Sequence, residues 1–128
     1  MIRRCQQPEK AEQSAIVQLL RSLGAAVYVL GTRRRKGDYQ GTMQTPGIPD
    51  LLIFLPLPSD VAARSEHDWR QVWVEVKAPT GRPSYEQRDF AQRCVLAGQD
   101  HITGGIDAVT GYLIVGGWLI GPRQRKVS

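Results

Sequence analysis

An acid and a base share one face of the strand-like segment at residues 72–77, Val-Trp-Val-Glu-Val-Lys. Side chains of a strand alternate between two faces, so the three valines form one face and Trp73, Glu75 and Lys77 form the other. A strand rises about 3.3 Å per residue, which places the Cα atoms of Glu75 and Lys77 roughly 6.6 Å apart. A buried carboxylate and ammonium must pair with each other, bind a metal or meet a charged substrate. Glu75 and Lys77 are therefore candidate catalytic residues, although Glu-x-Lys is also common on half-exposed strands.

A second acid lies at the start of another strand-like segment. Gly-Ile-Pro-Asp at 47–50 precedes the apolar run at 51–55, and proline fits the first position of a strand because it has no amide donor. If the two strands pair, Asp50 and Glu75 converge at one edge of the sheet. Two adjacent carboxylates repel each other, and a divalent cation removes the conflict.

This pair of acids indicates metal-assisted hydrolysis of a phosphodiester. Mg²⁺ prefers hard oxygen ligands and typically takes one or two protein carboxylates beside a substrate phosphate. Lys77 would orient or deprotonate the attacking water, or neutralise charge in the transition state. Asp50 and Glu75 are accordingly the predicted metal ligands, and Mg²⁺ or Mn²⁺ is the predicted cofactor.

The rest of the sequence must supply the elements that position these residues. Hydrophobic periodicity and turn residues predict a helix at 9–23, a strand at 25–33, acidic strands at 50–55 and 71–77, a helix at 85–97, a short strand at 101–103 and a helix at 108–115. The run at 113–115 could equally be a strand, and 56–70 is expected to form a long loop or hairpin tip. The order α-β-β-β-α-β-α predicts an α/β fold with a mixed central sheet flanked by helices. A chain of 128 residues is expected to form a single domain, 1–128.

The first predicted helix offers a third acid. Glu12 lies on the same stripe as Ile16 and Leu20 at helical spacing, which turns it toward the sheet. The alternative is that Glu12 and Glu9 only favour the positive N-terminus of the helix. Glu9 is the substitute if Glu12 does not reach the site.

Two roles are open for Gln87. Ser-Tyr-Glu-Gln at 84–87 fits a capping box, in which Ser84 caps the helix and Gln87 reaches back to the serine amide. Gln87 also shares a face with Phe90 and Cys94, the apolar side that must pack on the sheet. Ser84 itself is expected to be only a cap.

In this order, the motifs resemble the virus-type replication-repair nuclease (VRR-NUC) domain of the PD-(D/E)xK nuclease superfamily. The resemblance rests on Gly-Ile-Pro-Asp at 47–50, Glu-Val-Lys at 75–77 and Gly-Arg-Pro-Ser-Tyr-Glu-Gln at 81–87, and it runs from about Glu12 to Gly105. It departs from the family pattern at 56–70, which holds polar sequence that the core does not require.

The resemblance implies a restriction-endonuclease-like core and a metal-dependent nuclease, often encoded by phages. The implied metal ligands are Asp50, Glu75, Glu12 and the backbone carbonyl of Val76. The implied catalytic residues are Asp50, Glu75, Lys77, Gln87 and Glu12. Stand-alone members of the family look like dimeric enzymes that cut branched DNA such as Holliday junctions, so a homodimer acting on junction DNA is expected.

The net charge of +5 is unevenly distributed, because nine of the 17 basic residues lie in three short segments without an acid. These residues are Arg3, Arg4, Arg33, Arg34, Arg35, Lys36, Arg123, Arg125 and Lys126. The cluster at 33–36, followed by glycine-rich sequence to Gly47, predicts a flexible loop that binds nucleic-acid phosphates. A solvated face is the alternative, and it is the favoured interpretation of the C-terminal tail.

No apolar run reaches membrane-spanning length and the N-terminus lacks the apolar stretch of a signal peptide, so a cytoplasmic location is expected, in the bacterial host if a phage encodes the chain. Cys5 and Cys94 lack metal-ligand spacing, and Cys94 is expected to be a reduced core thiol. His67 and His101 are isolated from any second histidine or cysteine.

The sequence thus predicts a DNA endonuclease that acts on structured DNA. A catalytically silent nucleic-acid-binding module with the same fold is the alternative, and a plain soluble domain with a surface Glu75–Lys77 pair is a third. The apolar runs at 112–115 and 118–120 are candidates for a dimer contact or for ordinary core packing.

Overall fold

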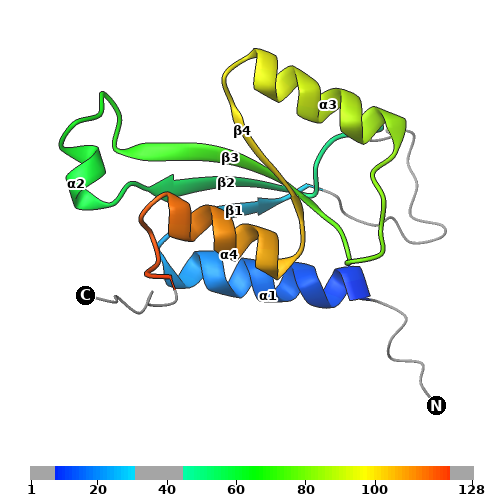
Figure 1. Cartoon of the computed structure of the whole chain (residues 1–128), viewed down its shortest axis with the longest axis horizontal. Coiled ribbons are helices and arrows are strands. Elements are labelled where there is room, and N and C mark those ends of the chain that lie inside the picture. The colour runs from blue at the N-terminus through cyan, green and yellow to red at the C-terminus, as the bar shows by residue number, and fades with distance from the viewer. Residues whose placement is uncertain (1–7, 31–44, 122–128) are drawn as a thin grey trace, which may run out of the picture.

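This computed structural model describes residues 8–30 and 45–121. These residues contain four strands and four helices, joined by loops (Figure 1). In chain order they are α1 (Pro8–Ser22), β1 (Ala26–Val29), β2 (Leu51–Pro56), α2 (Ser59–Ala62), β3 (Trp69–Val76), α3 (Tyr85–Leu96), β4 (Asp100–Gly104) and α4 (Ile106–Val115). The predicted order is confirmed, and the run at 113–115 belongs to a helix. The segment at 56–70 adds one element, the single helical turn α2.

The sheet is mixed, as the sequence predicts. Its strand order is β1-β2-β3-β4, with β1 and β2, and β2 and β3, antiparallel and β3 and β4 parallel. The β2–β3 hairpin pairs from Leu51 opposite Val74 to Pro56 opposite Trp69, and α2 lies at its far tip (Figure 1). The parallel step from β3 to β4 needs a crossover connection, and α3 supplies it.

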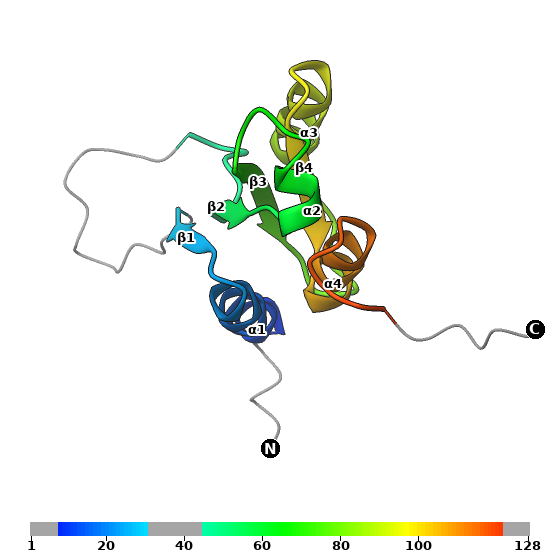
Figure 2. The same ribbon diagram turned by 90° about the vertical axis from the view of Figure 1, so that its left-hand side faces the viewer.

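The hydrophobic core lies on one face of the sheet. Alternate residues of β2 and β3 point to this face because strand side chains have a period of two. They pack against α1 and α4, which lie together on the same side of the sheet in both views (Figures 1 and 2). The buried residues of this core are Ile16, Leu20, Leu51, Ile53, Leu55, Val72, Val74, Val76, Ile102, Val109 and Leu113.

The opposite face carries the intervening residues of β3, and α3 lies over the β3–β4 part of it (Figure 2). Trp73 meets Phe90 of α3 edge-on, with ring centroids 5.2 Å apart, and Phe90 also approaches His101 of β4 at 6.1 Å. Burial lowers the pKa of His101. The alternation predicted for 72–77 is therefore confirmed, since the valines enter the core and Trp73 and Glu75 face α3.

The C-terminal apolar runs contribute mainly to packing within the chain. Leu113 is fully buried, Tyr112 stacks on Trp118, and the Trp118 indole donates a hydrogen bond to the carbonyl of Pro56 at 2.6 Å. Val115 and Ile120 are the exceptions, with 89% and 98% of their surface exposed. Among the described helices, none is long and apolar enough to cross a membrane.

Candidate functional site

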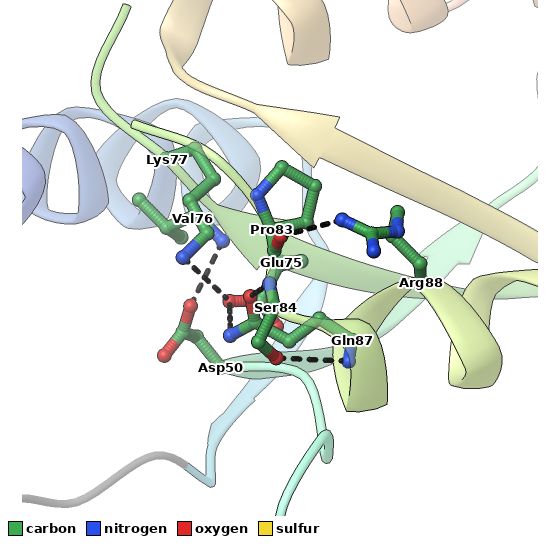
Figure 3. A network of polar contacts seen from close by, with 8 residues as sticks. All are labelled: Asp50, Glu75, Val76, Lys77, Pro83, Ser84, Gln87 and Arg88. Atoms are coloured by element: carbon green, nitrogen blue, oxygen red, sulfur yellow. Dashed lines mark hydrogen bonds and ion pairs between the residues drawn. The ribbon is translucent and has the colours of Figure 1, made fainter. Parts of the chain in front are cut away.

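The start of β2 and the end of β3 meet because the two strands are antiparallel. Leu51 pairs with Val74, so Asp50, one residue before β2, comes beside the last residues of β3. The Asp50 carboxylate accepts a hydrogen bond from the amide of Val76, with Oδ2 and N 2.8 Å apart (Figure 3). This contact attaches the loop before β2 to the end of β3 and places Asp50 next to Glu75.

The loop at 45–50 also packs against α3. Gly47 has a φ of +93°, and a Cβ atom there would lie 2.6 Å from the carbonyl oxygen of Glu86. Only glycine permits both the left-handed backbone and this close approach. The first turn of α3 and the Asp50 loop are thereby held together.

Glu75 is the centre of the site. Its side chain is only 4% exposed, and it is the single buried charged residue among the described residues. Its Oε2 accepts a hydrogen bond from Nε2 of Gln87 at 2.7 Å and lies 3.9 Å from Nζ of Lys77 (Figure 3). Its Oε1 is buried without a hydrogen-bond partner in the described structure. A buried carboxylate oxygen without a partner is costly, so Oε1 is a candidate position for a ligand.

The surroundings of Glu75 raise its pKa to about 8. Burial is the main cause, and the negative charge of Asp50 is the second. The Lys77 ammonium opposes them, while the charge of Glu9 adds to the rise. A carboxyl in this setting favours its protonated form unless a cation compensates its charge.

A divalent cation fits these residues. Asp50 and Glu75 carry hard oxygen atoms side by side, and Oε1 of Glu75 is free of other partners in the described structure and would be available to a cation. No cluster of three or more His, Cys, Asp or Glu side chains suited to a metal occurs in residues 8–30 and 45–121. A cation held here would therefore depend on the two carboxylates of Asp50 and Glu75, on backbone carbonyls such as that of Val76, and on water. Mg²⁺ usually keeps several waters and takes only one or two protein carboxylates.

Lys77 lies directly after β3. Its amide donates to the carbonyl of Gly104, at 2.9 Å, which extends the parallel pairing of β3 and β4 by one residue. This anchors the backbone of Lys77 while its side chain turns toward Glu75 (Figure 3). The sequence prediction that Glu75 and Lys77 share a face agrees with this contact.

The helix acids have different surroundings. Glu12 accepts a hydrogen bond from the amide of Ile106 at 2.6 Å and so caps the start of α4 from the neighbouring helix. A Cβ atom at position 105 would lie 2.2 Å from Oε1 of Glu12, so any larger residue there would displace the Glu12 carboxylate. Glu9 is the helix acid whose charge acts on Glu75, and its carboxylate lies beside Gly81. Glu12 and Lys77 line one cavity of about 320 Å³, together with Gly105 and others.

Gln87 combines the predicted capping role with a contact to Glu75. Ser84 and Gln87 form a complete capping box at the start of α3, and the free end of the Gln87 amide reaches Glu75. Glu9, the predicted substitute for Glu12, is the helix acid whose charge acts on Glu75, whereas the capping of α4 by Glu12 was not predicted from the sequence. Helical spacing could have indicated that the two acids lie on one side of α1, but not which of them reaches β3.

Most of the remaining sequence candidates are not among the described residues. Arg33, Arg34, Arg35 and Lys36 fall outside the described residues, as do Cys5 and the basic terminal segments. Cys94 is buried on α3, and burial raises the pKa of its thiol. His67 lies in the β2–β3 hairpin, at the opposite end of β3 from Glu75.

Comparisons with known proteins bear on the fold. The sequence matches no profile of a known protein family and none of the curated proteins. Among solved structures, it is similar to a chain described as "VRR_NUC domain", with 24% sequence identity and a TM-score of 0.58. The similarity covers 84% of this chain and 95% of that chain. The described residues therefore have the fold of a VRR_NUC domain, a mixed sheet flanked by helices.

Proposed function

We propose that this chain is a single-domain, metal-dependent DNA endonuclease of the VRR-NUC type. The observation that carries the proposal is the buried Glu75, whose Oε1 has no partner in the described structure while its neighbours are Asp50 and Lys77. The fold does not need a buried charged pair here for stability, because burying an apolar residue at position 75 would carry a smaller desolvation penalty. The shared fold with a VRR_NUC domain supports the same conclusion.

Asp50 and Glu75 would hold Mg²⁺ or Mn²⁺, with the carbonyl of Val76 and one helix glutamate as further ligands. Glu12 is the glutamate that the family resemblance implies, whereas the electrostatic contact with Glu75 favours Glu9. A bound cation supplies Lewis-acid stabilisation of the negative charge that develops on the scissile phosphate.

Lys77 is the residue of the chain proposed to act on the attacking water. Its ammonium group lies 3.9 Å from Glu75 Oε2, close enough to hold a water or a phosphate oxygen beside the acids. Gln87 donates to Glu75 and keeps the carboxylate in one orientation. The substrate is proposed to be branched DNA such as a four-way junction, bound with the help of the basic cluster at 33–36.

A cleavage panel tests the proposal. Single-stranded, duplex, flap and four-way-junction DNA are incubated with the full chain and Mg²⁺ or Mn²⁺. We expect cleavage that EDTA abolishes, with the junction cut fastest. Asp50→Asn and Glu75→Gln should each lower the rate by orders of magnitude while leaving DNA binding intact, since each removes ligand charge without changing volume.

The same panel separates the enzyme from a silent binding module. A wild-type chain that binds these DNAs and cuts none of them with either metal would make it a binding module. Near wild-type rates for both Asp50→Asn and Glu75→Gln would show that the metal site lies elsewhere.

A further inference from the structure

Gln87 makes three hydrogen bonds, two of them through opposite ends of its side chain. Its Oε1 accepts from the backbone amide of Ser84 at 2.8 Å, and its backbone N–H donates to Oγ of Ser84 at 3.1 Å. Its Nε2 donates to Oε2 of Glu75 at 2.7 Å (Figure 3). A glutamine amide has its acceptor at one end and its donors at the other. Because Ser84 occupies the acceptor, the donor end must face Glu75.

The capping box therefore explains why position 87 is glutamine. Capping boxes accept glutamate or glutamine three residues after the cap, because either can receive the hydrogen bond from the cap amide. Only glutamine can also donate to Glu75. A glutamate at 87 would cap α3 equally well and would bring a carboxylate oxygen against a second carboxylate that is buried.

We infer that Ser84 is a positioning residue for Glu75 and acts through Gln87. The capping box fixes the Gln87 amide, the amide holds Oε2 of Glu75, and Oε1 is left as the oxygen that receives a ligand. The hydrogen-bond relay stands by itself, and its consequence for metal binding rests on the proposed function. Ser84 is exposed, so substituting it creates no cavity in the core.

The relay can be tested first without metal or DNA. The side-chain amide of Gln87 is followed by ¹⁵N NMR in the full chain, with Gln87→Glu used to assign its signal. We expect Glu75→Gln to shift the signal, because the carboxylate acceptor is removed. We expect Ser84→Ala to shift it as well and Ser84→Thr to leave it in place, since threonine also caps helices. An unmoved signal in Ser84→Ala would overturn the inference.

The consequence is tested by Mn²⁺ titration calorimetry and by junction cleavage. Ser84→Ala should weaken Mn²⁺ binding and lower kcat by roughly 10- to 100-fold, the usual effect of removing a group that orients a metal ligand. KM for DNA should stay unchanged. Ser84→Thr should remain within about twofold of wild type in both assays. Equal losses in the two Ser84 variants would overturn the inference, as would wild-type Mn²⁺ affinity in Ser84→Ala.

Gln87→Glu is the matched control for helix stability. It retains the cap of α3 and replaces the donor to Glu75 with a second carboxylate, so the helix content should hold while kcat falls. Retained kcat in Gln87→Glu would overturn the inference. The NMR signals can also behave as expected while neither the wild-type protein nor any variant cuts DNA. In that case the hydrogen-bond relay stands and the proposed nuclease function fails.

Discussion

The two carboxylate oxygens of Glu75 have different surroundings. Oε2 is satisfied by Gln87 and approached by Lys77, whereas Oε1 has no partner within the described structure. Burial and the charge of Asp50 raise the pKa of Glu75 to about 8. The negative charge of Glu75 is therefore removed by a proton at neutral pH, or it would be balanced by a bound cation.

A stability profile against pH tests this state of Glu75. In metal-free protein, the folded state keeps the Glu75 proton up to about pH 8, while the unfolded state releases it near its ordinary pKa of 4.5. The folded state binds more protons between these values, so the free energy of unfolding falls as pH rises through this window and levels off above it. Thermal melts from pH 4.5 to 9 with EDTA should show this slope in wild type and a weaker one in Glu75→Gln. Parallel profiles would mean that Glu75 is ionised in the fold.

At the scale of elements, α1 connects to two other parts of the molecule. Through Glu12 it caps α4, and through Glu9 it adds negative charge near the end of β3. The glycine at position 105 leaves room for the first contact. The two acids are three residues apart on one helix, so their different roles depend on how α1 lies against the sheet.

Matched amide substitutions separate the roles of the two helix acids. Glu12→Gln keeps an oxygen that accepts from Ile106, so both stability and cleavage should stay near wild type, whereas Glu12→Ala removes the cap and should lower stability by about 1 kcal/mol. Glu9→Gln should slow cleavage more than Glu12→Gln, because it removes a charge that acts on Glu75. Urea denaturation and initial cleavage rates measure the two effects. A larger rate loss in Glu12→Gln would return Glu12 to the metal site, as the family resemblance implies.

At the scale of the whole molecule, a single chain carries one candidate site within its described residues. A four-way junction presents two equivalent strands, and paired incision calls for two copies related by a two-fold axis. Val115 and Ile120 are almost fully exposed apolar residues near the C-terminal end of the described chain, which suits them to such a contact. Their neighbour Leu113 is buried in the core, and Tyr112 and Trp118 pack against that core while remaining partly exposed.

A double substitution tests this contact. Light scattering at micromolar concentration should give a dimer for wild type and a monomer for Val115→Asp combined with Ile120→Asp. Both residues are exposed, so the two substitutions should leave the core of each chain intact. The doubly substituted protein should therefore still unfold cooperatively. A wild-type monomer that cuts both strands of a junction would contradict the dimer.

The basic cluster at 33–36 is expected to contribute to DNA affinity over the whole molecule. Replacing Arg33, Arg34, Arg35 and Lys36 by serine should weaken junction binding and reduce the slope of log affinity against log salt by about 0.9 for each phosphate that the chain no longer binds. The same change at Arg123, Arg125 and Lys126 is the control and should matter less. Fluorescence anisotropy over a salt series measures both slopes, and equal reductions would contradict the ranking of the clusters.

The sequence by itself determined the element order and the core of the candidate site. Alternation at 72–77 separates the valines from Glu75, the proline before Asp50 marks the start of β2, and Ser84 with Gln87 marks the start of α3. Each of these signals is local, because strand alternation, helical spacing and capping are properties of a few neighbouring residues. The resemblance to a nuclease domain depends on the same local motifs, and the fold it implies is confirmed.

The tertiary structure decided which side chains meet across elements. It assigned Gln87 both a capping role and a contact with Glu75, turned Glu12 toward α4, and brought the charge of Glu9 to the site. It also divided the C-terminal apolar runs into buried and exposed residues. None of these outcomes follows from spacing along the chain. They depend on how α1 packs across the sheet and on how α3 packs against β4. Contacts between residues far apart in the sequence determine both arrangements.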